Sequence, residues 1–312
     1  MPIGPLAAVW LGALAFAALL LAALEADYRF HGQRPQIPDS EGVLAIVARD
    51  AMSAPNSAVI IAGSSRALRG LDAATMSAAL DGRRVFQLAQ PGISCLPVLE
   101  QIARASTFSG TVVCGVEPTS LFGEDERVRE RTGLPLLRLP SATWVGLIDV
   151  RLSIVARSHL SILGLDIRTM AKPILGLARW PAPGVLADPF LRKSMLHFTG
   201  VDTAAADARS ARLYETTGGQ GTTPLELQQT IAYVAGLAAQ ISRRGGRVIF
   251  VELPSSGRTR AVEERRYPRD RYWDRFASTV GAPTLNSADQ ATLSAFRCPD
   301  GSHLDSDDTP AY

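Results

Sequence analysis

The sequence predicts an α/β protein in which helices cover both faces of a central, mostly parallel β-sheet, as a three-layer sandwich, with one membrane-spanning helix before it. Three observations predict this architecture. Short β-branched runs alternate with segments of helical spacing, as in parallel strands joined by crossover helices. A long uncharged segment stands near the N-terminus. The alternation of strands and helices is interrupted by roughly a hundred residues that do not show it. Because such a stretch is too long for a loop, we expect an inserted helical subdomain.

The composition indicates a folded chain with a sizeable core. Of the 312 residues, 46% are hydrophobic and 20% charged, which excludes an intrinsically disordered chain. A net charge of +2 gives no strong attraction to nucleic acid, so we expect no nucleic-acid partner.

The segment from Pro5 to Leu24 is the predicted membrane anchor. It carries no charge, and its twenty residues span roughly 30 Å as a helix, the thickness of a hydrocarbon core. A core helix would carry a polar stripe, and this segment has none. A cleaved signal peptide is the alternative, but its apolar region is usually only about 7–15 residues long. We therefore assign residues 1–25 to an uncleaved anchor and 26–55 to a linker and a first helix.

The remaining residues, 56–312, are predicted to form one α/β domain with an insertion at about 119–223. Strands are expected at 58–62, 84–88, 111–116, 247–253 and 283–285. Helices are expected at 66–80, 96–105, 224–243 and 271–280. The cysteines, Cys95, Cys114 and Cys298, match neither a disulfide framework nor a metal site. We expect Cys95 and Cys114 to be buried, and one disulfide stays open as an alternative.

Polar features stand where two predicted strands end, the place at which open α/β sheets bind ligands. Gly63, Ser64 and Ser65 follow the first strand. A serine there is either exposed for chemistry or simply caps the next helix. Gly92 lies in the turn after the second strand, where a glycine can direct a backbone N–H at a substrate oxygen.

The C-terminal loop contributes a carboxylate and an imidazole. Asp300 and His303 are three residues apart, so the carboxylate can hold one ring nitrogen while the other nitrogen takes up a proton. Of the other histidines, His31 lies in the linker after the anchor, and His159 and His197 lie in the insertion without an acidic partner at motif spacing. An incidental polar loop is the alternative for His303.

Together, AGSSR at 62–66, the glycine of QPGIS and DGSH at 300–303 resemble the motifs of the SGNH/GDSL hydrolase superfamily. The similarity is to its membrane-anchored branch, which works on O-acyl groups of bacterial envelope polysaccharides. That branch includes alginate-type O-acetylation proteins and teichoic-acid D-alanyl transfer proteins. The resemblance covers roughly 55–118 and 224–305 and leaves the insertion uncovered.

This resemblance implies a role for each motif residue. Ser65 would be the nucleophile, with Ser64 in place of the family's aspartate. His303 would be the general base, and Asp300 its orienting acid. The N–H groups of Ser65 and Gly92 would form an oxyanion hole, and neither a metal nor an organic cofactor would be needed.

The third motif departs from the family pattern. The family has an asparagine after the third strand, whose side chain donates to the oxyanion, whereas this chain has Glu117 in GVEP. An ionised carboxylate cannot donate a hydrogen bond. Thr119 and Ser120 are the supporting candidates for the missing donor, with Ser64 beside the nucleophile. Loss of one such donor costs about 10²–10³ in rate.

Two functional hypotheses follow. The first is a serine-dependent acyl transferase or acyl esterase that acts on O-acyl groups of cell-envelope polysaccharide through an acyl-serine intermediate. The alternative is a non-catalytic polysaccharide-binding or scaffold protein on a degenerate SGNH fold. The resemblance also implies partners: a polysaccharide or other acyl acceptor, and a membrane-bound acyl donor protein.

The resemblance implies a single-pass protein of the inner (cytoplasmic) membrane, with its body in the periplasm or outside. The flanking charge favours the opposite orientation, because no Lys or Arg precedes the anchor while Arg29 and Arg34 follow it. A cytoplasm-facing lipid esterase is therefore a third hypothesis, which rests on the charge rule alone.

Overall fold

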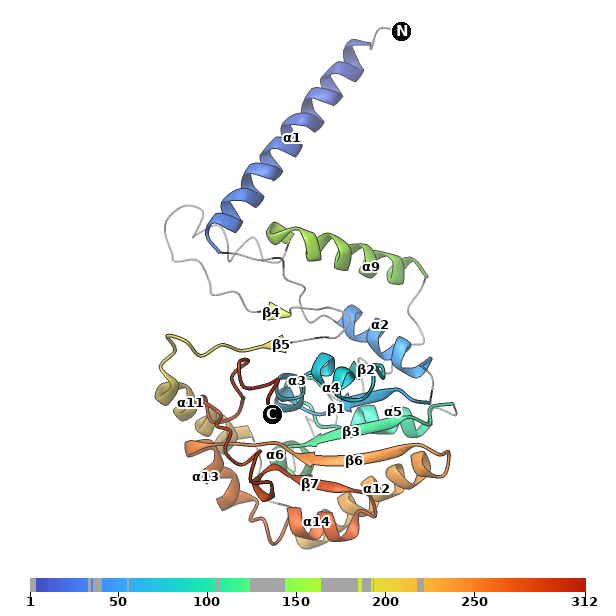
Figure 1. Ribbon diagram of the computed structural model, residues 1–312, viewed down its shortest axis with the longest axis vertical. Coiled ribbons are helices and arrows are strands. Elements are labelled where there is room, and N and C mark those ends of the chain that lie inside the picture. Colours follow the sequence, from blue (N-terminus) through green and yellow to red (C-terminus); the bar gives the residue numbers. More distant parts are fainter. Residues whose placement is uncertain are drawn as a thin grey trace.

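The protein consists of an α/β body from which one long N-terminal helix projects (Figure 1). The structure is a computed structural model that describes residues 4–32, 35, 41–54, 56–104, 107–123, 144–163, 185–186, 192, 194–217 and 222–312. Five parallel strands form one sheet in the order β2-β1-β3-β6-β7. They are β1 (Val59–Ala62), β2 (Val85–Gln87), β3 (Thr111–Val116), β6 (Arg247–Glu252) and β7 (Thr284–Asn286). The predicted α/β class and parallel sheet are confirmed.

Both faces of the sheet are buried, which explains why its strands are continuous apolar runs in the sequence. Ile60 and Ala62 of β1 belong to a large apolar cluster, whereas Val59 and Ile61 belong to a second, smaller one. The large cluster contains residues of α2 (Glu41–Met52), α5 (Leu96–Arg104), α12 (Pro224–Ser242) and α14 (Trp273–Thr279). The smaller cluster contains residues of α3 (Ser65–Gly70) and α4 (Ala73–Ala79).

The prediction of a single helix at 66–80 is wrong, because two short helices occupy this segment. Helix α3 ends at Gly70, and Leu71 is extended, with φ −115°. Asp72 then caps α4 by accepting hydrogen bonds from the N–H groups of Ala74 and Thr75. The polar N-cap side chain breaks the helical run.

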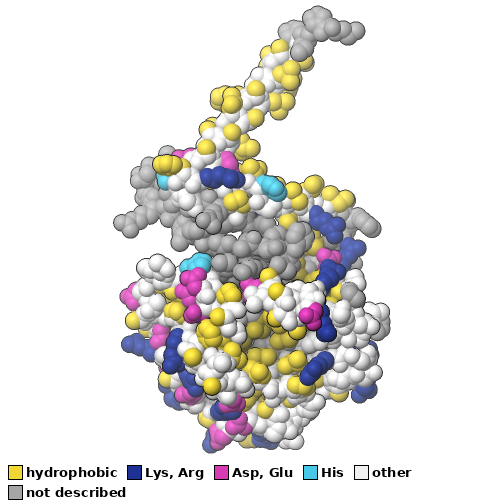
Figure 2. All heavy atoms as spheres, in the orientation of Figure 1, with side chains coloured by type: hydrophobic (Ala, Val, Ile, Leu, Met, Phe, Trp, Pro, Cys, Tyr) yellow, Lys and Arg dark blue, Asp and Glu magenta, His cyan; other side chains and the backbone are white. Residues whose placement is uncertain are grey.

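The N-terminal helix α1 (Pro5–Phe30) contains the predicted anchor and continues past it. It is long and apolar enough to cross a membrane, and its large apolar side chains are exposed. Large side chains such as those of Leu6, Trp10, Leu14 and Phe16 touch little of the body, as Figure 2 shows for the projecting helix.

Much of the predicted insertion lies outside the described residues. The described part contains α6 (Pro118–Phe122), α9 (Trp144–His159), the 3₁₀ turn η2 (Ser161–Leu163) and α11 (Thr203–Thr217). It also contains a short antiparallel pair, β4 (Val185–Leu186) with β5 (Ser194–Met195). Helix α11 packs against α13 (Gly257–Arg266), which the apolar pattern did not predict. The cysteines Cys95, Cys114 and Cys298 are buried and unpaired, as expected for the first two.

Candidate active site

The junction of β1 and α3 presents Ser65 at the carboxyl edge of the sheet. Gly63 has φ +143°, and a Cβ added there would lie 2.9 Å from both the Gly115 carbonyl oxygen and the Ala67 side chain. Only glycine fits this position without strain. Ser64 is buried and is the N-cap of α3, since its hydroxyl accepts a hydrogen bond from the Arg66 N–H at 3.3 Å. The capping role therefore belongs to Ser64, and the Ser65 hydroxyl has another partner.

That partner is His303, 238 residues further along the chain. The Ser65 Oγ atom lies 2.9 Å from His303 Nε2, and His303 Nδ1 lies 2.8 Å from Asp300 Oδ2. Because a carboxylate only accepts, Nδ1 carries the proton and Nε2 accepts the Ser65 hydroxyl proton. The structure thus brings together the three residues predicted from the sequence as nucleophile, base and orienting acid.

Asp300 is held in place and ionised. Its Oδ1 atom accepts hydrogen bonds from the backbone N–H groups of Ser302, at 2.9 Å, and His303, at 2.7 Å. Burial alone would raise the pKa of Asp300, but the His303 side chain and these two N–H groups outweigh it and lower the pKa below its usual value. A carboxylate is therefore available to orient the imidazole.

Sequence reasoning missed Arg69, which reaches the same imidazole. Its Nη1 atom lies 3.1 Å from His303 Nε2, so a second donor and a positive charge stand next to the Ser65 hydroxyl. Arg69 lies one helical turn after Ser65 on α3, and this i, i+4 spacing places both side chains on one face. Such spacing from a proposed nucleophile is the signal that could have identified it.

Sequence reasoning also missed Arg66, which links the two halves of the site. Its guanidinium is 3% exposed and pairs with Glu263 of α13, with Nη2 2.5 Å from Oε1. Its Nε atom donates to the hydroxyl of Ser302, the residue before His303, at 3.2 Å. The ring of Tyr214 of α11 lies against the guanidinium, and its hydroxyl is 3.0 Å from the same Ser302 hydroxyl. Arg66 therefore joins the nucleophile turn to the histidine loop.

The predicted oxyanion donors have the required freedom. Gly92 has φ +71° in the loop after β2, and the Gln90 N–H of this loop donates to the Gly63 carbonyl at 2.8 Å, which ties the loop to the serine turn. Among the described residues, no hydrogen bond engages the N–H of Ser65 or of Gly92. Both N–H groups can therefore donate a hydrogen bond to a substrate oxygen.

Of the two supporting candidates on α6 after β3, one hydroxyl is already engaged. The Ser120 hydroxyl donates to the Glu117 carbonyl at 3.1 Å, so it is occupied within α6. Thr119 is half-buried on the same short helix. Glu117 is itself buried, and its charge is one of those that raise the pKa of Arg66. Its position is explained by the buried guanidinium rather than by donation to an oxyanion.

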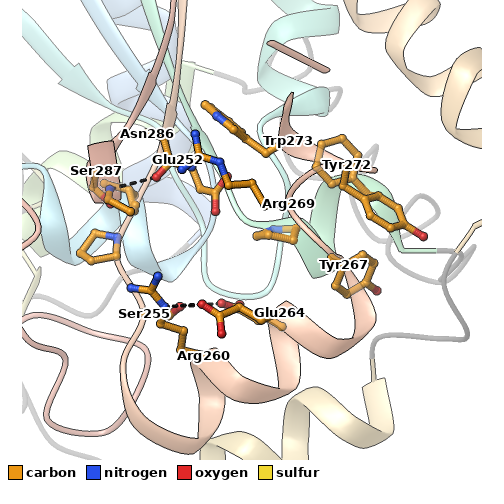
Figure 3. A pocket seen from close by; sticks show the side chains of 16 residues that line it. Glu252, Ser255, Arg260, Glu264, Tyr267, Arg269, Tyr272, Trp273, Asn286 and Ser287 are labelled. Atoms are coloured by element: carbon orange, nitrogen blue, oxygen red, sulfur yellow. Dashed lines mark hydrogen bonds and ion pairs between the residues drawn. The ribbon is translucent and has the colours of Figure 1, made fainter. Parts of the chain in front are cut away.

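A pocket of about 90 Å³ lies further along the same edge of the sheet (Figure 3). It is formed where β6 and β7 end, and Tyr267, Tyr272 and Trp273 contribute aromatic side chains. Within the described chain, the buried Oε2 atom of Glu252 has no hydrogen-bond partner. Burial, reinforced by Glu263 and opposed by nearby arginines, raises the pKa of Glu252 to about 7.

One group of side chains among the described residues has the composition of a metal site. His197, Asp305 and Asp307 place their ligand atoms within 4.8 Å of one another. His197 and Asp307 are exposed. The distances from His197 Nδ1 to the carboxylate oxygens of Asp305 and Asp307 are long, at 3.9 Å and 3.8 Å. Exposed acidic groups of this kind are common without a metal, so the group carries no assignment. The Nδ1 atom of His31 lies 2.8 Å from the Asp27 carbonyl oxygen, and that of His159 lies 2.9 Å from the Val155 carbonyl oxygen.

Comparison of the chain with protein-family models, with curated proteins and with solved structures finds no match.

Proposed function

We propose that this protein is a serine-dependent acyl transferase or acyl esterase that acts on O-acyl groups of cell-envelope polysaccharide through an acyl-serine intermediate. The observation that carries the proposal is the hydrogen-bonded chain from Ser65 through His303 to Asp300. Three groups from opposite ends of the sequence meet in the order nucleophile, base and orienting acid, as nucleophilic catalysis requires.

In the first half-reaction, Ser65 Oγ attacks the carbonyl carbon of an acyl ester while its proton passes to His303 Nε2. The imidazolium that forms is stabilised by Asp300, to which Nδ1–H remains bonded. The N–H groups of Ser65 and Gly92 donate to the oxyanion of the tetrahedral intermediate. The bond to the leaving alcohol then breaks, and the alcohol oxygen takes the proton from Nε2.

In the second half-reaction, a hydroxyl of the acceptor replaces the leaving alcohol. His303 removes its proton as the oxygen attacks the acyl carbon, and Ser65 leaves with the proton returned by Nε2. A polysaccharide hydroxyl as the acceptor gives transfer, and water gives hydrolysis. The Arg69 guanidinium lies beside Nε2, so it adds a positive charge next to the Ser65 hydroxyl.

We further propose that the fold is a three-layer sandwich of the SGNH type with a helical insertion. The two apolar clusters on opposite faces of the parallel sheet support the layering. The positions of Ser65 after β1, Gly92 after β2 and the Asp300–His303 loop after β7 support the family. Tyr214 of the insertion contacts the site through Ser302, so the insertion supports the catalytic loop.

The same proposal places α1 in the inner membrane and the body in the periplasm, beside a membrane-bound acyl donor protein. The long exposed apolar helix supports membrane crossing. The periplasmic side rests on the resemblance to envelope O-acylation proteins, which meet their acceptor there. The charges that flank α1 favour the opposite orientation, but they consist of only two arginines and are a weak indication.

Replacing Ser65 by Ala tests the proposal, because it removes one oxygen and leaves the Ser64 cap in place. We expect hydrolysis of a small chromogenic acyl ester by the full chain in detergent to fall to the level of the uncatalysed reaction. Ser64→Ala is the matched control, and we expect it to retain turnover with reduced stability. Full turnover by the Ser65→Ala protein contradicts the assignment.

A second candidate function is that of a non-catalytic polysaccharide-binding protein. Glu117, buried where the family has its donor asparagine, favours it. This candidate predicts that polysaccharide binding is unchanged by Ser65→Ala and that Ser65 never carries an acyl group. Mass spectrometry of the protein after mixing with an acyl ester separates the two functions.

A further inference from the structure

Helix α9 has apolar side chains on two opposite faces. Val150 and Ile154 form the inner face: Ile154 is buried in the large core cluster, and Val150 packs against Gly42 of α2. At 100° per residue, a second set falls on the opposite side of the helix. This set, called here the outer face, consists of Val145, Ile148, Leu152 and Val155, whose exposed fractions are 77%, 54%, 65% and 56%.

Such a stripe differs from the scattered exposed apolar residues of ordinary protein surfaces. Single exposed side chains need no partner, but contiguous apolar residues over nearly three helical turns indicate a surface that contacts something apolar. Figure 2 shows hydrophobic atoms on this segment, on the side of the body from which α1 projects. The outer face is therefore directed toward the anchor end of the molecule.

The C-terminal end of α9 is bonded to α1 at the first charged residue of the anchor helix. The Glu25 carboxylate accepts hydrogen bonds from the N–H groups of Ser161, at 2.8 Å, and Ile162, at 2.9 Å, in the turn η2 that follows α9. Arg29 pairs with Glu25 at 2.7 Å and donates to the carbonyl of His159, the last residue of α9, at 2.8 Å. These bonds set where α9 stands along the axis of α1.

The position of Glu25 gives the depth of α9. The uncharged residues from Pro5 to Leu24 fill a hydrocarbon core of roughly 30 Å, so Glu25 stands at its boundary with the headgroups. A helix attached at that point, and running away from the α1 axis as in Figure 1, lies along the membrane surface. Arg151 is exposed between the inner and outer faces, where an interfacial helix carries its basic residues.

We propose that α9 is an interfacial membrane helix whose outer face contacts lipid. The proposal rests on the membrane crossing of α1 and is independent of the chemistry at Ser65. The expected depth of the outer face is roughly 5–10 Å into the boundary between headgroups and acyl chains. Attachment through both α1 and α9 restricts rotation of the body relative to the bilayer, which a single helix would allow.

Spin labels at single introduced cysteines test the proposal in the full chain, reconstituted alone in lipid nanodiscs. The native cysteines are buried, so the unsubstituted protein serves as the labelling blank. The variants are Leu152→Cys and Val155→Cys on the outer face, Leu20→Cys on α1, and Ser278→Cys at an exposed position of α14. Collision rates with dissolved oxygen, which concentrates in lipid, and with a water-soluble nickel complex report the surroundings of each label.

We expect the labels at 152 and 155 to resemble the label at 20, with oxygen accessibility above nickel accessibility, and the label at 278 to show the reverse. Labels at 152 and 155 that behave like the label at 278, while the label at 20 reports lipid, overturn the interfacial helix. Aqueous behaviour at 20 as well overturns the membrane crossing itself. None of these outcomes depends on whether Ser65 is a nucleophile.

Discussion

Replacing Glu263 by Gln should destabilise the protein by about 3–5 kcal/mol, because the change leaves the Arg66 charge buried without its partner. Arg66 and Glu263 are 3% and 6% exposed, and their side chains share two hydrogen bonds. Typical unfolding free energies are about 5–15 kcal/mol, so the expected loss is a large fraction of the total.

Thermal unfolding of the full chain in detergent measures this loss, and for a chain of 312 residues we expect the midpoint to fall by about 5–8 °C. The double variant Arg66→Met with Glu263→Gln removes both charges, and we expect it to recover most of the loss. Arg265→Gln, which breaks an exposed ion pair on the same helix, is the matched control and should change the midpoint little. A Glu263→Gln protein as stable as the unsubstituted one refutes the electrostatic reasoning.

Three further predictions concern the site and its surroundings. Asp300→Asn removes the acceptor for His303 Nδ1–H, and we expect acyl-ester turnover to fall by about 10⁴ with the fold retained, measured by kinetics alongside circular dichroism. Glu252 has a pKa of about 7 in the folded protein, above its unfolded value, so it binds more protons when folded and stability falls as pH rises from about 4.5 to 7. Glu252→Gln should remove this loss of stability, which is about 3 kcal/mol. Unfolding midpoints of both proteins at pH 5 and pH 8 measure the effect. Midpoints that change equally with pH in the two proteins contradict the prediction. Gly63→Ala forces a side chain at φ +143° against Gly115 and should cost about 1–3 kcal/mol, whereas Gly82→Ala, at a glycine with open space around it, should cost less.

The strands could be predicted because they are buried on both faces. The observed strand limits differ from the predicted ones by at most one residue, since a continuous apolar run between turn residues leaves little choice of boundary. Helix α13 could not be predicted in this way. Its sequence, GRTRAVEERR, has no apolar stripe, and its buried positions are Thr259, Val262 and Glu263, two of them polar. It packs against α11 and forms ion pairs. A hydrophobic pattern in the sequence does not indicate contacts of this kind.

The catalytic candidates were predictable because each stands at a motif position relative to a strand end. Ser65 and Gly92 lie in the connections that follow β1 and β2, and Asp300 and His303 lie in the C-terminal loop after β7. Arg66 was not identified because its buried role depends on Glu263, 197 residues away, and an arginine in a sequence is usually exposed. A tertiary ion pair between distant segments leaves no local signature.

The outer face of α9 is an intermediate case. The segment 144–177 is apolar but interrupted by charges, a pattern that fits amphipathic and buried helices equally. Only the contacts of Val150 and Ile154 with the core separate the inner face from the outer one. The bonds from Glu25 then relate the outer face to the membrane boundary.

The most direct test of the central claim is active-site labelling of the full chain with a fluorophosphonate. This probe reacts with serines activated by a base, and mass spectrometry of the peptide from Asp50 to Arg66 identifies the labelled residue. We predict an adduct on Ser65 that is lost in Ser65→Ala and strongly reduced in His303→Ala, with His197→Ala as the matched control that retains it. A folded protein that forms no adduct at Ser65, or forms it equally well without His303, contradicts the account of Ser65 as a base-activated nucleophile.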